Sequence, residues 1–512
     1  MVINPENISI IYRISKMINI LFLLPFTLFA QDADNSSISM KSGTTGSIGT
    51  VTMNGQMYNQ LSLRPEIPIG KLGIGLDIYL YFNDEGMYWE SWNFSSGGSA
   101  YRTIIDKIYY IRWGHPEDNL YFMAGALPSV TLGEGILVYN YANIMEYPQV
   151  RQIGLNLQAK VAGIDIELIH SNLKVAAPGI LGIRGSYSVF PKLSMGISLV
   201  TDLNQLAGLP DNDGDDYPDY YDYYPDDSSK WDDEDKWEKI YYSIPGADLD
   251  SFITWYEDSE FYNYYNPEEA ESDAISGIAL DAVHTLSEKI TLYSQVGFLI
   301  GEIDTTMLNP TIQLEKKSLG TGWVPLGARV KLGPINLLAE YRMGSRLFIF
   351  NFWDQAYDLN RVIVVDSILT RESQLYKYGK LNGFYTRADV SVFNLFNFGV
   401  GYQNMKGEKW DENINAYKLG ETNQTLLASV GIYPSLIPKV KKAEAFYQQS
   451  NVSNPFDFSP SSSTILGYDV GIKVSSGVML MYQGRTTYIS DLEKPGEFKP
   501  IKSIQIETQF II

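Results

Sequence analysis

Apolar and polar residues alternate over many short stretches of the chain, and the longest unbroken stretch covers residues 72–82. Leu72, Ile74, Leu76, Ile78, Leu80 and Phe82 alternate there with Gly73, Gly75, Asp77, Tyr79 and Tyr81. A period of two places the two sets on opposite faces of a β-strand. The same alternation recurs near residues 109–113, 153–161, 181–189, 193–199, 278–282, 324–331, 335–342, 384–392, 468–474 and 504–512. The pattern predicts an all-β chain whose strands have one apolar and one polar face.

The connections between these predicted strands are of two alternating kinds. Short turns are expected at 162–163, 190–192, 286–289, 333–334, 393–396 and 475–477, and Asn54-Gly55 is typical of a hairpin turn. Long polar connections are expected at 83–105, 202–275, 301–322, 344–381, 403–424 and 451–463. Short turns at one rim and long loops at the other are typical of outer-membrane β-barrels, whose tilted strands span an apolar band of roughly 25 Å.

The chain therefore resembles a bacterial outer-membrane β-barrel of the porin kind. We expect residues 46–512 to form a transmembrane antiparallel β-barrel of roughly 16 to 20 strands, with short periplasmic turns and long extracellular loops.

Charged residues within the predicted strands fall on the face opposite the aliphatic one. An Arg that faced lipid at mid-membrane would cost about 2–4 kcal/mol, so these residues are expected to point into a polar lumen of mixed sign. The predicted pore-lining residues are Asp77, Arg112, Arg184, Asp281, Arg329, Lys331, Glu340, Arg342, Arg387 and Asp389.

The N-terminal region has the order of charge and hydrophobicity that is typical of a secretory signal. The apolar run Ile18–Ala30 follows Arg13 and Lys16, and it is too short for a spanning helix. We expect a signal peptide over residues 1–30, starting at Met1 or Met17, and a flexible Ser/Gly/Thr-rich leader over 31–45. No other segment reaches 18 apolar residues, so the sequence predicts no membrane-spanning helix, and the absence of cysteine excludes disulfides.

One connection, residues 202–275, carries nearly all of the net charge. It holds 23 Asp and Glu residues against three Lys, a net charge of −20 in a chain of −21. The alternation of turns predicts that this acidic tract is an extracellular loop inserted in the barrel. Nucleic acid is excluded as an expected partner of such a surface.

Within the acidic tract, carboxylates recur with the spacing of a calcium-binding loop. Asp211, Asp213, Asp215, Asp219 and Asp222 occupy relative positions 1, 3, 5, 9 and 12, and the carbonyl of Tyr217 would occupy position 7. With Pro218, this stretch resembles a thrombospondin type-3 calcium repeat, which implies a structural Ca²⁺ ion. It departs from that family at Asp216, where the family has Gly.

The acidic tract is also rich in Tyr and Trp. Aromatic residues at this density can stack on sugar rings or bind a protein, and they can also pack against one another. We favour the second interpretation.

Two further stretches are informative. Residues 127–150 break the alternation between two strands, and the sequence leaves open whether this segment or the acidic tract plugs the lumen. Residues 504–512 resemble the C-terminal strand that the barrel assembly machinery recognises, although the chain ends in Ile512 and its aromatic residue is Phe510.

Enzymatic chemistry is not expected. The three histidines, His115, His170 and His284, have no metal-site spacing. The stretch His170-Ser171-Asn172 superficially resembles the catalytic set of outer-membrane phospholipases, but nothing around it matches that family.

The expected function is porin-like passage of small polar solutes across the bacterial outer membrane, since a barrel of this size leaves an aqueous channel unless it is plugged. Outer-membrane lipid and the barrel assembly machinery are the expected partners. The alternative is a surface-binding or adhesion protein whose barrel anchors the acidic tract, and a role in secretion or envelope assembly also stays open.

Overall fold

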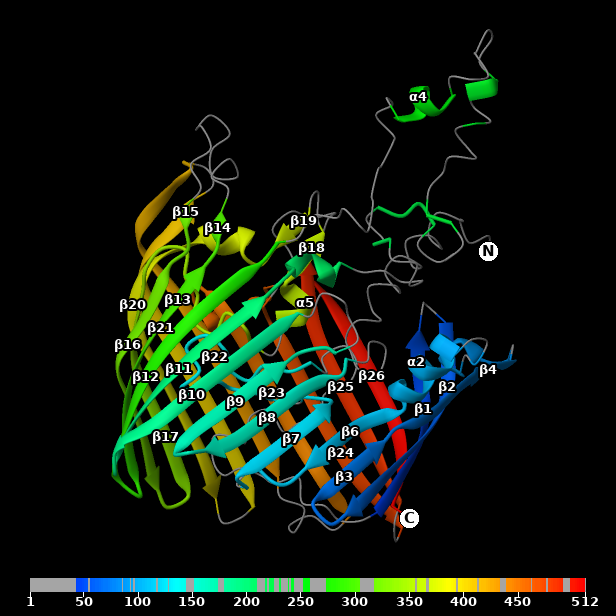
Figure 1. Ribbon diagram of the computed structural model, residues 1–512, viewed down its shortest axis with the longest axis horizontal. Coiled ribbons are helices and arrows are strands. Elements are labelled where there is room, and N and C mark those ends of the chain that lie inside the picture. The colour runs from blue at the N-terminus through cyan, green and yellow to red at the C-terminus, as the bar shows by residue number, and fades with distance from the viewer. Residues whose placement is uncertain are drawn as a thin grey trace.

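The structure is a computed structural model that describes most of residues 43–511 (Figure 1). It does not describe 1–42, 54–55, 85, 93, 95–96, 117, 128, 144–151, 174–178, 304–316, 355–356, 365–367, 393–394, 412–413, 433–438, 462, 476–477, 491–497 or 512, nor 210–272 apart from 217–218, 221–224, 230–231, 238, 241–243 and 252–257. The predicted signal peptide and most of the predicted leader therefore lie outside the described residues.

The described chain is dominated by one 22-stranded antiparallel sheet, which confirms the all-β barrel class. Its strands are β1 (Gly43–Met53), β2 (Gln56–Ile69), β3 (Leu72–Leu76), β4 (Ile78–Asn83), β5 (Gly86–Met87), β6 (Ile108–Trp113), β7 (Leu120–Gly125), β8 (Gly154–Val161), β9 (Ile164–His170), β10 (Ile180–Phe190), β11 (Leu193–Asp202), β12 (Ile275–Ser287), β13 (Ile290–Ile300), β16 (Thr321–Leu332), β17 (Ile335–Gly344), β20 (Tyr378–Val392), β21 (Phe396–Asp411), β22 (Ala416–Ile432), β23 (Val440–Val452), β24 (Ile465–Ser475), β25 (Val478–Ser490) and β26 (Phe498–Ile511).

Smaller elements lie in the connections. They are η1 (Trp89–Trp92), α2 (Gly97–Asp106), η2 (Gln205–Gly208), α4 (Phe252–Glu257), β14 (Glu302–Ile303), β15 (Lys317–Ser318), α5 (Tyr357–Asn360), β18 (Val362–Val364), β19 (Ile368–Thr370), η4 (Ser373–Lys377) and η5 (Pro455–Asp457). Among the described residues, no helix has both the length and the apolar character needed to cross a membrane.

Strands that are neighbours in sequence are neighbours in the wall. β3 and β4 are separated only by Asp77 and both pair with β2, while β5 pairs with β4 alone. Counting β3 and β4 as one position and leaving out β5, the 22 described strands make 20 wall positions. This even number lies at the upper end of the predicted range.

The two ends of the sheet meet at one rim only. β1 pairs with β26 through Thr45–Gly49 against Glu507–Ile511. β3 pairs with β6 as far as Leu76, and in the described pairings β4 continues along β2 and β5 instead. Figure 1 shows β1 and β2 leaning away from β26 above that rim. The wall is thus joined at the rim where the chain enters and leaves it, and it is not closed over its full height.

The two rims differ as the sequence predicts. Two-residue connections join β8 to β9, β10 to β11, β12 to β13, β16 to β17 and β24 to β25, all at the rim that also holds the β1–β26 pairing. The long connections lie at the opposite rim, which also holds the two-residue connection from β1 to β2, where the sequence predicts a hairpin. The predicted long connection 403–424 is wrong, because β21 and β22 pair continuously to Asp411 opposite Ala416.

The error at 403–424 has a physical cause. Across this hairpin Trp410 packs edge-to-face on Tyr417, with 5.1 Å between ring centroids. Cross-strand aromatic pairs of this kind stabilise a hairpin without an apolar face. The loss of apolar alternation was therefore misread as the end of the strands.

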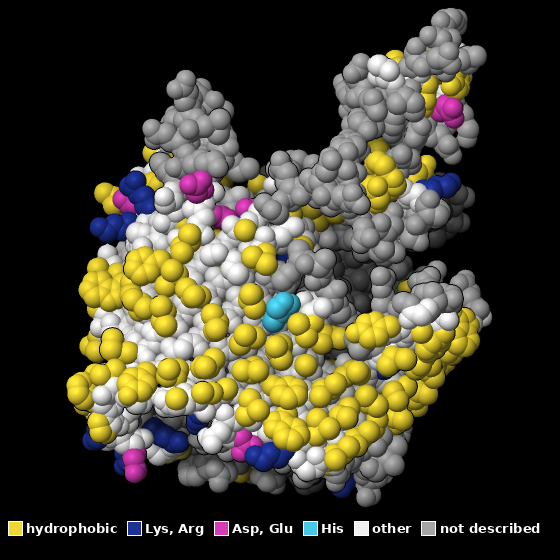
Figure 2. Space-filling view, viewed as in Figure 1, with side chains coloured by type: hydrophobic (Ala, Val, Ile, Leu, Met, Phe, Trp, Pro, Cys, Tyr) yellow, Lys and Arg dark blue, Asp and Glu magenta, His cyan; other side chains and the backbone are white. Residues whose placement is uncertain are grey.

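Apolar side chains cover the outside of the sheet, and charged side chains gather mainly beyond them toward the rims (Figure 2). On β10, for example, Leu181, Ile183 and Tyr187 are exposed while Arg184 is buried. The predicted facing is wrong at one residue of β16. Trp323 and Leu326 both face outward across a bulge, so Val324, predicted to face outward, is fully buried inside. The extra residue changes the phase of the alternation.

Candidate functional site in the lumen

The predicted pore-lining residues lie on the inner face of the wall. Seven of them are buried there: Asp77, Arg112, Arg184, Asp281, Glu340, Arg342 and Arg387. Asp389 and Arg329 are partly exposed, and Lys331 is exposed next to the short turn between β16 and β17.

These residues form separate ion pairs along the wall. Arg184 pairs with Asp281 at 2.7 Å and with Glu167 at 3.3 Å. Arg342 pairs with Glu340 at 2.6 Å, Arg387 pairs with Asp389 at 2.8 Å and Asp77 pairs with Arg64 at 3.1 Å. Arg112 instead donates to the carbonyl oxygen of Gly114 at 2.8 Å. Most of the charge on the inner wall is therefore compensated locally, by ion pairs of both signs.

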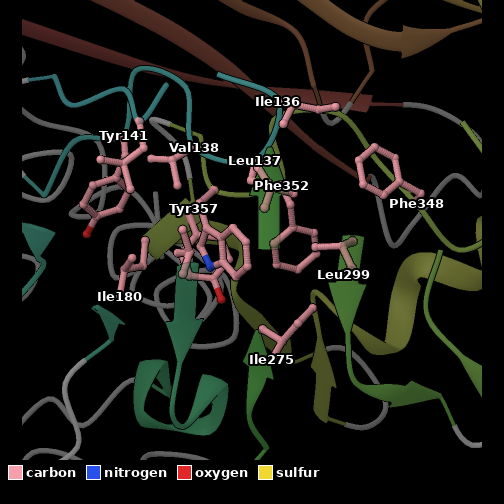
Figure 3. Close-up of a cluster of buried hydrophobic side chains, with 14 of the residues drawn as sticks. Ile136, Leu137, Val138, Tyr141, Ile180, Ile275, Leu299, Phe348, Phe352 and Tyr357 are labelled. Atoms are coloured by element: carbon pink, nitrogen blue, oxygen red, sulfur yellow. The ribbon is translucent and has the colours of Figure 1, made fainter. Parts of the chain in front are cut away.

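Residues 127–143, between β7 and β8, fold into the lumen. Leu127, Leu132, Ile136, Leu137, Val138 and Tyr141 are all buried there. They pack against inward side chains of the wall, among them Ile180, Ile275 and Leu299 (Figure 3). The question that the sequence leaves open for 127–150 is thus resolved for residues 127–143, which form a luminal segment. Residues 144–150 lie outside the described part.

A second connection, residues 345–377 between β17 and β20, packs against the first one. Phe348, Phe352, Trp353, Tyr357 and Leu375 belong to the same apolar cluster (Figure 3). The two segments are also joined through their main chains. Asn351 N donates to Ile136 O at 2.9 Å, Trp353 N donates to Leu137 O at 2.9 Å, and Tyr139 N donates to Trp353 O at 3.1 Å.

This joint insert is therefore a hydrogen-bonded part of the fold. The sequence reasoning assigned 344–381 to an extracellular loop and missed the role of Trp353.

Glycines on the inner face of the wall make room for the insert. A Cβ atom added at Gly277 would lie 2.9 Å from a methyl carbon of Leu137 and 3.0 Å from the Trp353 ring. One added at Gly182 would lie 2.9 Å from Leu132. Glycine inside a strand often marks a site where another backbone approaches closely. Inward glycines at 182, 277, 297 and 322 are therefore the sequence signal that could predict a filled lumen.

Glu134 is the only charged residue of segment 127–143, and it faces the charged wall. It forms an ion pair with Arg329 at 2.8 Å. Gln295 holds the same turn of the segment, accepting from Ile136 N at 3.1 Å and donating to Glu134 O at 3.4 Å. Arg387 Nη1 donates to the hydroxyl of Tyr139 at 3.4 Å. The insert thus brings a carboxylate and a phenol to two of the predicted pore-lining arginines.

The apolar cluster occupies one side of the lumen. Its wall residues come from β9–β13 and β16. The described inner-face residues of β2, β3, β21 and β24 do not belong to it and are mostly polar, for example Gln60, Ser62, Gln403 and Asp469. The insert therefore narrows the lumen from one side and leaves a polar wall on the other.

A buried polar network ties the insert to the base of the acidic tract. The Tyr357 hydroxyl donates to Asp202 at 2.9 Å, and Arg361 lies 3.7 Å from the same carboxylate. The Tyr141 hydroxyl donates to Asp358 at 2.7 Å. Burial raises the pKa of Asp358 to about 6, against the opposing effect of Arg361. Both ends of the network belong to long connections at the same rim.

The predicted calcium ligands are only partly visible. Asp211, Asp213, Asp215 and Asp219 lie outside the described residues, while Tyr217 and Asp222 lie within them. The described residues contain no group of three or more His, Cys, Asp and Glu side chains arranged to hold a metal.

Several described aromatics of the tract pack against one another. Tyr217 stacks on Trp231 at 4.3 Å, and Phe252 and Tyr241, which are buried, lie 5.6 Å apart.

Ser171, which the sequence placed beside His170 in a superficial catalytic set, has a structural role. Its Oγ accepts a hydrogen bond from Ile180 N at 2.8 Å, and its carbonyl oxygen accepts one from Asn143 at 2.9 Å.

Comparisons with known proteins give no closer assignment. No protein-family model matches the chain, and no curated protein matches its sequence. Among solved structures, a mutant of the Rh. blastica porin is 10% identical, with 71% of this chain and 90% of that chain covered and a TM-score of 0.27. The outer membrane protein OprD from Pseudomonas aeruginosa is 9% identical, with 92% of each chain covered and a TM-score of 0.34.

A third solved structure is Wzi, an outer membrane protein involved in group 1 capsule assembly in Escherichia coli and described as a carbohydrate-binding β-barrel. It is 10% identical, with 92% of this chain and 83% of that chain covered and a TM-score of 0.33. Likenesses at these TM-scores carry no argument, so the fold rests on the strand pairings described above.

Proposed function

We propose that the protein is a bacterial outer-membrane channel for small polar solutes, which pass through the part of the lumen that the insert leaves open. The observation that carries this proposal is the contrast between an apolar outer face and an inner face of buried, ion-paired charges. An inner face of this kind is typical of a barrel that holds water. Because most of these charges have a local partner of opposite sign, the lining suits neutral or zwitterionic solutes.

The narrow part of the path is proposed to lie where Glu134 and Tyr139 face Arg329 and Arg387. Here a solute would meet one carboxylate, one phenol and two guanidinium groups within one short stretch. Asp77, Arg112, Arg184, Asp281, Lys331, Glu340, Arg342 and Asp389 are proposed to line the path above and below.

The acidic tract is proposed to lie on the extracellular side and to hold a structural Ca²⁺ ion through Asp211, Asp213, Asp215, Asp219, Asp222 and the carbonyl of Tyr217. The surface-binding alternative would use the tract's aromatic residues. The self-packing of Tyr217 with Trp231 and of Tyr241 with Phe252 favours the channel. Outer-membrane lipid and the barrel assembly machinery remain the proposed partners.

The test is ion conductance of the purified protein in planar bilayers. Replacing Glu134 by Gln removes the negative charge beside Arg329, so the permeability should shift toward anions. Replacing Arg387 by Gln leaves Asp389 and should shift it toward cations. One unit charge at ~4 Å in water is worth about 1 kcal/mol, which corresponds to about a fivefold change in the permeability ratio.

Glu288→Gln is the matched control, because Glu288 is exposed at the short turn between β12 and β13. Its permeability ratio should equal that of the wild type. A reconstituted protein that conducts no ions, or ratios that change alike in all three variants, would contradict the proposal.

A further inference from the structure

A pair of carboxyl groups lies where the base of the acidic tract meets the luminal insert. Glu372 belongs to the insert and is only 2% exposed. Asp273 lies two residues before the start of β12, at the end of the acidic tract. Gln205, in η2 at the start of the tract, donates through one amide nitrogen to Asp273 at 3.2 Å and to Glu372 at 3.4 Å. Two carboxyl groups are therefore held together on one amide.

The orientation of the Gln205 amide indicates whether the two carboxyl groups hold a proton or a metal ion between them. Its amide oxygen accepts from the backbone N–H of Glu372 at 3.1 Å, which turns its nitrogen toward both carboxyl groups. A cation site would need oxygen ligands directed at the same point. Two carboxylates this close cannot both ionise at low cost, and a shared proton removes the repulsion. The geometry therefore favours a proton over a metal ion.

The surrounding charges do not neutralise the pair. The guanidinium of Arg371, the residue next to Glu372, is engaged by Asp354 at 3.2 Å, and that of Arg361 lies 3.7 Å from Asp202. From β14, Glu302 contributes a backbone hydrogen bond. In the described part of the chain, no Lys or Arg forms an ion pair with either carboxyl group.

We propose that the Glu372–Asp273 pair is a proton-dependent latch that holds the base of the acidic tract against the luminal insert and releases it when the shared proton is lost. Through this contact the pH outside the cell would act on the mouth of the channel. The neighbouring contact of Tyr357 with Asp202 does not require a shared carboxyl proton, so the rest of the insert stays in place when the latch opens.

The pH range follows from the direction of the shift. Burial, followed by the charge of Asp273, raises the pKa of Glu372 from 4.5 to about 8. The closed latch thus holds a proton that the open one releases. Its stability is fully present below about 4.5 and is lost as the pH rises to about 8.

The absence of cysteine makes a direct test possible, because introduced cysteines are the only labelling sites. Spin labels at Ala207→Cys in η2 and Lys377→Cys at the end of η4 would report the distance between the two partners by electron–electron double resonance. In the full-length protein, a single short distance is expected at pH 5, and a longer population should grow as the pH rises toward about 8.

Glu372→Gln keeps a hydrogen-bond donor toward Asp273 and removes the titration, so the short distance should persist at every pH. Asp273→Asn removes the neighbouring charge but leaves Glu372 buried, so it should weaken the pH response, and it serves if the first variant does not assemble. Glu302→Gln removes an exposed carboxylate nearby and should retain the wild-type response. A wild-type distance that ignores pH, or a response that survives in both Glu372→Gln and Asp273→Asn, overturns the proposal.

Discussion

Two connections at the same rim, residues 127–143 and the acidic tract 202–275, behave in opposite ways. The first contains a single charged residue among its 17 residues and is folded into the lumen. The second carries a net charge of −20, and its ends are anchored at Asp202, Gln205 and Asp273. Moving apolar side chains out of water is favourable, whereas a dense set of like charges cannot enter a confined space without partners. Composition therefore selects which connection fills the lumen.

The comparison also shows that the wall must be prepared for the insert. Gly277 and Gly182 have no side chain at the positions where Leu137, Trp353 and Leu132 approach the wall. We call the inward glycines of the wall and the apolar side chains around them the seat of the insert. No comparable apolar seat contacts the described residues of the acidic tract between 210 and 272. The lumen of this protein is thus shaped by a match between an apolar connection and a glycine-bearing wall.

The largest effect on the packing of the insert is expected from removing the side chain of Trp353. Trp353→Ala removes a fully buried ring that packs against Phe352 at 4.9 Å, and such truncations cost about 3–5 kcal/mol. Amide exchange of residues 130–139 should accelerate by roughly two to four orders of magnitude, and single-channel conductance should rise. Trp113→Ala, which removes an exposed ring on the outer face of β6, is the control and should leave both unchanged. Unaltered exchange in Trp353→Ala would show that the insert is held by other contacts.

A smaller effect on the packing of the insert is expected from adding a side chain at Gly277, where the insert contacts the wall. Gly277→Val places methyl groups where Leu137 and Trp353 lie, and overpacking of this kind costs about 1–3 kcal/mol. Exchange of residues 130–139 should increase, but less than in Trp353→Ala. Gly185→Val is the matched control on β10, because no atom lies within 4 Å of an added Cβ there. Equal effects of the two substitutions would mean that β-strand stability, not the seat, is being measured.

The smallest effect on the lumen is expected from the acidic tract itself. Asp213→Ala combined with Asp215→Ala removes two of the predicted calcium ligands, so titration calorimetry should show weakened Ca²⁺ binding. Exchange of residues 130–139 should not change, because the described contacts of the tract with the insert lie at its base, at Asp202 and Gln205, and not at the predicted calcium ligands. Calcium binding equal to that of the wild type would reject the predicted site, and a changed exchange rate would show that the tract acts on the insert.

The parts of the fold that the sequence predicted correctly depend on a strict local pattern. Alternation over 72–82 and 181–189 requires one face in a polar environment and one in an apolar environment, and the described residues there follow it. The error at Val324 came from one extra residue in β16, which no periodicity reveals before the pairing partner is known. The error at 403–424 came from a hairpin that is polar on both faces.

The site was harder to predict because it depends on contacts between distant segments. Arg329 and Arg387 could be placed on the inner face from their own strands. Their partners Glu134 and Tyr139 lie about 200 to 250 positions away in sequence. The local sequence pattern of residues 127–143 does not predict which strands of the wall the segment contacts. Only the inward glycines indicate which part of the wall the segment contacts. They can be interpreted in this way only when several of them face the same side of the lumen.

The short pairing between β1 and β26 gives the wall an uneven mechanical strength. β26 pairs with β25 over the whole of Val478–Ser490, but with β1 only over Thr45–Gly49. Backbone groups in a hydrocarbon layer need partners within the protein, and a ladder resists separation through the hydrogen bonds that it contains. Tension in the surrounding membrane would therefore be borne least on this side of the wall, where the β3–β6 and β6–β7 ladders are as short or shorter. The opposite side, where the insert is packed against β9–β16, is the stiff side of the barrel.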